Sequence, residues 1–279
     1  MLQALPRMFL AELRLVSSMS ISANSNTGIF GGFFEWFGEL GIFSWWVLRA
    51  AVTPPYEFRE LARQVDEIGS KSFPLVAVAG AAIGAILSLE TRDSLVRFGA
   101  KSLLPAAVVF SIIHEIGPII TGLIVCGRVG AGIGAELGSM KVTEQIDAIE
   151  VSAVSPYRLL AATRVLACML VLPLLTLAAD FFGVVMAWLA DALSDPISFR
   201  QFIHSGFNSF NFNDFLPPTF KTAVFGLIIG LVASFMGMRT RGGTEGVGRT
   251  ATNSVVLSSL FVILADVIMV KLIVIFFPS

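Results

Sequence analysis

Ionisable side chains inside long apolar runs are the residues of this sequence that could do chemistry. His114 and Glu115 lie together just before a Gly-Pro pair, and four more charged residues fall in or beside later apolar runs: Asp180, Lys221, Asp266 and Lys271. A charged side chain near a bilayer centre costs roughly 2.5–3.5 kcal/mol on insertion scales. Charges in such places therefore usually pair with one another or serve a function.

Two kinds of chemistry suit these six residues. Asp180 and Asp266 fit ion pairs with the other intramembrane charges, Lys271 included, that would fix a helix bundle, and they fit a functional role equally well. Glu115 and Lys221, with His114 beside them, favour a polar lining for the passage of lipid headgroups.

Several other chemistries are excluded by what the chain lacks. The two histidines and two cysteines have no metal-ligand spacing, and no Ser–His–Asp constellation occurs, so we expect neither a metal site nor catalytic residues. The run GAGIG at 130–134 resembles a nucleotide fingerprint but follows an apolar helix instead of a strand, and GK[ST] is absent. We therefore expect no cofactor, no bound nucleic acid and no enzymatic activity in this chain.

Long apolar helices must hold the charged residues in place. The 279-residue chain is 55% hydrophobic and 14% charged, with a mean hydropathy of +0.82, whereas soluble domains carry about 25% charged residues. This composition predicts an all-α polytopic membrane protein. We predict five transmembrane helices near residues 73–89, 103–126, 165–189, 222–238 and 255–277.

The distribution of positive charge predicts the orientation of these spans. Thirteen of the 19 Lys and Arg residues fall in the segments 1–72, 128–164 and 239–249. Cytoplasmic segments are enriched in Lys and Arg, so five spans place the N-terminus in the cytoplasm and the C-terminus on the outer side.

The chain ahead of the first span divides into two parts. Residues 1–28 combine an amphipathic segment with a small, polar linker. Residues 29–72 contain a Trp- and Gly-rich stretch with Glu35 and Glu39 inside it, followed by a charged helix. We predict that the Trp- and Gly-rich stretch lies in the membrane interface and that the charged helix lies at the cytoplasmic surface. Residues 73–279 form the five-helix domain.

A polar stretch separates the second and third predicted spans. Residues 139–153 read SMKVTEQIDAIEVSA, with an apolar stripe at helical spacing and a start typical of a capped helix. On the cytoplasmic side, such a helix can convey rigid-body motion from a soluble partner to the bundle. The polar residues available to that partner are Lys141, Glu144, Gln145, Asp147 and Glu150.

Four glycines at spacings of three and four precede this stretch: Gly127, Gly130, Gly134 and Gly138. Small residues at such spacing let helix backbones approach closely in lipid, so the ridge predicts tight helix packing.

A resemblance to a known family rests on residues 114–158, which read HEIGPIITGLIVCGRVGAGIGAELGSMKVTEQIDAIEVSAVSPYR. This stretch resembles the signature of the MlaE (YrbE) permease family, and agreement continues more weakly at 59–74, 164–183 and 242–256. The resemblance implies a homodimeric permease of an ABC transporter that moves phospholipid between the bacterial inner membrane and the outer envelope.

Partners and site roles follow from the same resemblance. It implies a cytoplasmic ATPase that binds the ATP, an MCE-domain protein on the outer, periplasmic side and often a small STAS-domain subunit. It makes 139–153 the coupling helix that docks in the ATPase, and it makes Glu115 and Lys221 candidates for the translocation path. This chain departs from the family at His114, where Arg is usual, so the permanent charge at that position is in question.

Two readings from other classes compete with the permease. An ion- or proton-coupled secondary transporter would use His114, Glu115, Asp180 and Asp266 as a relay, although no internal repeat is evident. A non-transporting membrane scaffold would instead anchor an envelope protein through the aromatic segment 199–215.

Overall fold

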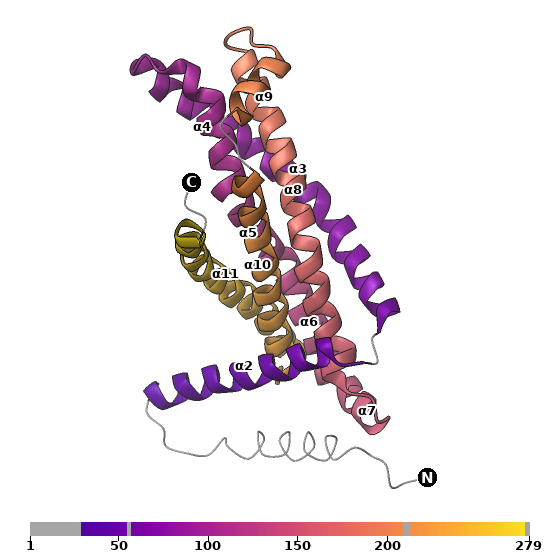
Figure 1. Cartoon of the computed structure of the whole chain (residues 1–279). Helices are drawn as coiled ribbons and strands as arrows, with labels where there is room; N and C mark the ends of the chain where they lie inside the picture. Colours follow the sequence, from indigo (N-terminus) through magenta and orange to yellow (C-terminus); the bar gives the residue numbers. More distant parts are fainter. Residues whose placement is uncertain (1–28, 55–56, 209–211, 277–279) are drawn as a thin grey trace. The chain divides into compact units, whose positions relative to one another are not determined.

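The computed structural model describes residues 29–54, 57–208 and 212–276, and these residues form helices without any strand (Figure 1). This confirms the all-α prediction. The chain divides into two compact units, residues 1–42 and 43–279. The predicted amphipathic segment and linker at 1–28 lie outside the described residues.

Helix α2 (Ile29–Val52) is continuous in spite of its glycines. It is not among the helices that are long and apolar enough to cross a membrane. Its last part belongs to the second unit, where Val47 is buried. There the ring of Phe43 packs against those of Phe235 and Tyr157, with centroids 5.4 and 5.8 Å away.

Five helical stretches of the described chain are long and apolar enough to span a membrane, as predicted. They are α3 (Phe58–Arg97), the stretch Lys101–Val142, the stretch Tyr157–Ala192, residues Phe215–Met238 of α10 (Phe212–Met238), and α11 (Gly243–Phe276). Two short helices lie between them, α7 (Gln145–Val151) and α9 (Phe199–Phe207).

The second and third stretches are built from several segments each. The second consists of the 3₁₀ turn η1 (Lys101–Leu103), α4 (Leu104–Ser111), η2 (Ile112–Ile116), α5 (Gly117–Val125), η3 (Cys126–Gly130) and α6 (Ala131–Val142). The third consists of η4 (Tyr157–Ala162) and α8 (Thr163–Ala192). Three of these short segments, η2, η3 and η4, are π-helical turns.

Helix α3 runs through the predicted boundary between residues 72 and 73, so the charged segment and the first span are one helix. Pro74 lies inside it. An internal proline removes one helical hydrogen bond, and packing on α8 supports the helix at this level, where the rings of Phe73 and Phe182 meet edge to face.

Glycines bring three of the helices into close contact. A Cβ on Gly80 of α3 would lie 2.5 Å from the carbonyl oxygen of Ala179 on α8, and one on Gly84 would collide with the carbonyl of Gly183. On α10, a Cβ on Gly230 would lie 2.7 Å from the Cα of Val165. Helix α8 is therefore held between α3 and α10 by backbone contact, the mode of packing that small residues allow in lipid.

The predicted glycine ridge is only partly a packing surface. Gly134 lies against the side chain of Ser254 on α11, and a Cβ on Gly138 would lie 2.7 Å from Thr240 Oγ1. A Cβ on Gly127 would meet nothing within 4 Å. The spacing identified a real contact with α10 and α11 but included a glycine that faces away from both.

Large apolar side chains cover the outer faces of the long helices. Val78 on α3, Leu174 on α8 and Val267 on α11 are each more than half exposed. Apolar surface on this scale suits lipid and not water. Within the second unit, α7 lies at one end of the bundle and α9 at the other, where α9 packs on α4 through Phe202 and Gly206 (Figure 1).

Candidate functional site

A fully buried lysine joins three of the long helices. Lys221 of α10 has no exposed surface, and its Nζ lies 2.8 Å from Glu115 Oε2 and 2.9 Å from Asp266 Oδ1. Glu115 comes from η2 and Asp266 from α11. We call these three residues the Lys221 cluster. One cation between two carboxylates satisfies a charge that would otherwise be very costly inside the bundle.

The two carboxylates differ in their access to the surroundings. The Asp266 side chain is 5% exposed and that of Glu115 is 44% exposed. Asp266 therefore holds the lysine from inside the bundle, while Glu115 is the member that faces outward. Of the three residues in the cluster, Glu115 is therefore the one that a polar ligand can reach.

Glu115 owes its position to an irregular backbone. It lies on the π-helical turn η2, directly before Gly117 and Pro118. A π turn holds one residue more than an α turn and is often found at functional sites, and Pro118 lacks the N–H that an α-helix would use there. His114 lies on the same turn, and its ring stacks on Phe110 with centroids 4.0 Å apart. The structure thus places His114 next to the Lys221 cluster in the chain and against an aromatic ring in space.

The remaining predicted intramembrane charges do not join this cluster. Asp180 of α8 is buried beside Gly117, and neither of its oxygens has a hydrogen-bond partner among the described residues. Lys271 is exposed near the end of α11. Of the two aspartates considered for ion pairing, the structure pairs Asp266, and its partner is Lys221.

The predicted helix at 139–153 is divided into two helices. Helix α6 ends at Val142, and Glu144 takes a left-handed conformation with φ of 58° before α7 begins at Gln145. No side chain caps this start, so the expected capped start is wrong. At the other end, Ala153 is also left-handed, with φ of 60°.

Helix α7 presents its polar side outward and its apolar side to the core. Ile146 is buried in the main hydrophobic cluster, and Ile149 packs against it. Glu144, Gln145 and Asp147 are exposed. The last residue of the predicted stripe, Ala153, is exposed as well, because the helix has already ended.

Two of the residues predicted to meet a partner contact each other. Lys141 Nζ lies 2.7 Å from Asp147 Oδ1, an exposed ion pair between the end of α6 and α7. Glu150 is half-buried at the end of α7. The exposed residues of this set that form no ion pair among the described residues are therefore Glu144 and the amide Gln145.

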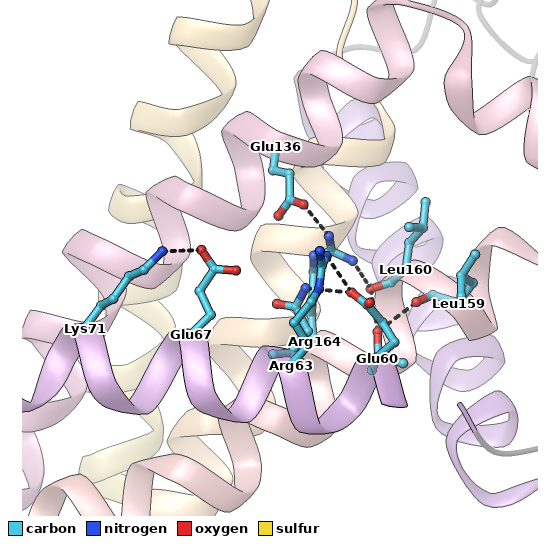
Figure 2. A network of polar contacts seen from close by, with 10 residues as sticks. Glu60, Arg63, Glu67, Lys71, Glu136, Leu159, Leu160 and Arg164 are labelled. Carbon is cyan, nitrogen blue, oxygen red and sulfur yellow. Dashed lines mark hydrogen bonds and ion pairs between the residues drawn. The ribbon is translucent and has the colours of Figure 1, made fainter. Parts of the chain in front are cut away.

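Sequence reasoning missed a second set of ion pairs, at the α7 end of the bundle. Arg164 of α8 is 1% exposed and lies 2.7 Å from Glu136 of α6 (Figure 2). On α3, Arg63 pairs with Glu60 at 3.0 Å. In the sequence, both arginines contribute only to the positive charge that predicts the cytoplasmic side. The place of Arg164 directly before a long apolar run is the feature of the sequence that could have indicated its burial.

A third polar set lies where α3 ends and α8 ends. Arg92 pairs with Asp191 at 3.5 Å and also with Asp195, which Lys101 contacts too. The hydrogen bond from Lys101 lowers the pKa of the Asp195 carboxyl. Asp195 thus stays charged, and the ends of α3 and α8 stay connected, well into the acidic range.

The described residues contain no group of three or more His, Cys, Asp and Glu side chains arranged to hold a metal ion. The polar features on which a function can rest are a buried lysine with an accessible carboxylate partner and an exposed acidic helix at one end of the bundle.

Comparisons with known proteins agree with this arrangement. The family model described as Permease MlaE matches residues 61–272. A probable ABC transporter permease protein of Rickettsia typhi is 32% identical over 265 residues, covering 95% of this chain and 98% of its own. One from Synechocystis is 30% identical over 208 residues, with 75% and 79% covered. The protein TRIGALACTOSYLDIACYLGLYCEROL 1 of Arabidopsis thaliana is 30% identical over 212 residues, with 76% and 61% covered.

Proposed function

The chain belongs to the MlaE permease family, and from this premise we propose that it is the membrane subunit of an ABC transporter that moves phospholipid between the bacterial inner membrane and the outer envelope. In this proposal the N-terminus is cytoplasmic and the C-terminus periplasmic. The permease acts as a homodimer and has no nucleotide site of its own.

The observation that carries the proposal is the Lys221 cluster. A lysine with no exposed surface sits inside an apolar bundle, and one of its two carboxylate partners, Glu115, is 44% exposed. Intramembrane charges of this kind usually mark a substrate pathway. A charged cluster inside an apolar bundle suits an amphipathic substrate, whose headgroup donors can hydrogen-bond to the outward-facing Glu115. The name of the Arabidopsis relative, which is that of a glycolipid, points to the same class of molecule.

Helix α7 supplies the second part of the proposal. It is exposed, acidic and placed between the second and third candidate spans. A cytoplasmic ATPase can bind it there and displace the helix bundle. We propose the ATPase, an MCE-domain protein on the periplasmic side and a small STAS-domain subunit as the partners of this chain.

Reconstitution of the permease with its co-purifying partners into vesicles tests the proposal. We expect labelled phospholipid to leave the vesicles only when ATP is supplied, and the chain purified alone to hydrolyse no ATP. Transfer driven by an ion gradient without ATP would favour a secondary transporter that uses the buried carboxylates. If no lipid is transferred under either condition, the result would favour a non-transporting membrane scaffold.

One variant and its control connect this result to the Lys221 cluster. Glu115→Gln keeps a hydrogen-bond acceptor for Lys221 but removes the outward-facing charge, so we expect ATP-driven transfer to fall. Lys271→Gln removes a charge from an exposed position on α11 and should leave transfer near the wild-type rate. Equal rates in the two variants would contradict a role of the cluster in transport.

A further inference from the structure

One buried arginine closes the base of the hairpin formed by α6, α7 and α8. Arg164 stands at the start of α8 and is 1% exposed. Its Nη2 donates to Glu136 Oε1 at 2.7 Å, and its Nη1 donates to the carbonyl oxygen of Leu160 at 2.8 Å (Figure 2). The planar guanidinium thus binds α6 and the π-helical turn η4 with separate nitrogens.

The contact between Arg164 and Glu136 encloses the whole of α7. Glu136 lies on α6, Arg164 lies 28 residues further along, and α7 lies between them. The turns on either side of α7 contain Glu144 and Ala153, the two non-glycine residues with positive φ in the described chain. Left-handed backbone at such residues is unfavourable, and it bends the chain sharply at both ends of α7.

Helix α7 has few other attachments to the bundle. Ile146 is 4% exposed and packs in the main core, and the Lys141–Asp147 pair is exposed. Exposed ion pairs contribute little, whereas Arg164 is 1% exposed beside a Glu136 side chain that is 47% exposed, and charge-assisted hydrogen bonds are among the strong ones. Apart from Ile146 and Ile149, which pack on the core, the contact that fixes α7 against the spans is therefore the base of its hairpin.

The start of α3 joins the same region. Glu60 accepts from Arg63 and from Gln64, and Gln64 is buried. Arg63 also lies close enough to Glu136 to be attracted by it. Glu136 is thus paired with a buried arginine of α8, and the Glu60–Arg63 pair of α3 lies close to it (Figure 2).

We propose that the Arg164–Glu136 pair is the joint that fixes α7 to the spanning helices, so that a displacement of α7 moves the bundle and does not merely bend the hairpin. Arg164 and Glu136 are then positioning residues for transport. Their effect on transport rests on the proposed function, but the rigidity of the joint does not, and the two are measured separately.

The first experiment measures rigidity. Spin labels are placed at Val151 of α7 and Leu174 of α8, which are 89% and 64% exposed, while the buried Cys126 and Cys168 remain in place. The labelled chain is diluted with unlabelled chain and assembled with its ATPase. We expect a narrow distance distribution in the wild type with and without ATP. In Glu136→Gln, which keeps the shape of the side chain but removes its charge, the distribution should at least double in width.

The second experiment measures coupling, as lipid transferred per ATP hydrolysed. We expect Glu136→Gln to lower this ratio about tenfold, a typical coupling effect, while ATP hydrolysis and ATPase association persist. A merely structural defect would lower transfer and hydrolysis together. The matched control is Glu245→Gln, which breaks the exposed pair with Arg249 on α11 and should change neither the ratio nor the distances.

Arg164→Lys provides a second variant that keeps the charge. A lysine can reach only one of the two acceptors, so we expect an intermediate loss in both experiments. A narrow distance distribution in both variants would contradict the proposal that the Arg164–Glu136 pair fixes α7, whatever the rate of transport. If the wild-type complex moves no lipid, the proposed function is wrong. The distance measurement still tests whether the Arg164–Glu136 pair fixes α7.

Discussion

At the scale of single residues, the two buried aspartates show that burial alone does not define a role. Asp180 and Asp266 are 5% and 4% exposed. Asp266 lies 2.9 Å from the Lys221 Nζ, while Asp180 forms neither a hydrogen bond nor an ion pair with the described residues. A carboxylate that holds a buried cation stabilises the fold, whereas one that has no cation beside it costs desolvation free energy.

This difference predicts opposite effects of the same substitution. Asp266→Asn should lower the free energy of unfolding by roughly 1–3 kcal/mol, because the buried Lys221 loses the charge of one of its two carboxylate partners. Asp180→Asn should leave it unchanged or raise it, because the amide is nearly isosteric and no cation loses its partner. Thermal unfolding of the two variants in detergent, followed side by side, measures both. A larger loss of stability in Asp180→Asn would contradict the assignment.

At the scale of elements, the π-helical turns place several polar side chains. Glu115 lies on η2, Arg128 lies on η3 and donates to Ser72 of α3 at 2.7 Å, and η4 supplies the carbonyl that Arg164 binds. Each π turn adds a residue to its helix and rotates the side chains that follow. The second and third spans therefore change their facing direction along their length.

This irregularity explains what the sequence could and could not predict. Apolar runs gave the number and approximate place of the spans, because length and composition decide membrane insertion. A constant helical period could not show that Glu115 faces Lys221, since the π turns shift the register before and after it. The single helix predicted at 139–153 is wrong for a different reason, because nothing in its composition marks the left-handed Glu144 at which the chain breaks.

Packing between α3 and α8 yields a prediction at this scale. A methyl group on Gly84 would collide with the backbone of Gly183, and backbone cannot move aside as a side chain can. We expect Gly84→Ala to lower stability by about 1–3 kcal/mol, as overpacking usually does. Gly127→Ala is the matched control, since a methyl group there meets nothing within 4 Å. Thermal unfolding compares them, and equal melting temperatures would show that α3 and α8 separate more easily than the structure indicates.

At the scale of the whole molecule, α8 connects two polar ends of the second unit. It carries a buried charge near each end, Arg164 paired with α6 and Asp191 paired with Arg92 of α3. Between them it is packed tightly on α3 and α10 by glycine contacts. We expect a helix held at both ends and along its length to move as a unit, so that a displacement at the α7 end also shifts the opposite end.

The negative charge on the exposed side of α7 should contribute to binding of the ATPase. Glu144→Lys with Glu150→Lys reverses two acidic charges that form no ion pair among the described residues. We expect the Kd for the ATPase to rise about tenfold, which is roughly 0.7 kcal/mol for each reversed surface charge. The loss should shrink at high salt, because screening weakens exposed charge pairs.

A charge swap makes the control for this experiment. Lys141→Asp with Asp147→Lys keeps both the net charge of the surface and the 2.7 Å pair between α6 and α7. It should therefore bind the ATPase much more tightly than the double reversal. Binding of detergent-solubilised permease to immobilised ATPase provides the measurement. An unchanged Kd in the double reversal would mean that the apolar residues near α7, such as the exposed Val151, make the contact instead of its acids.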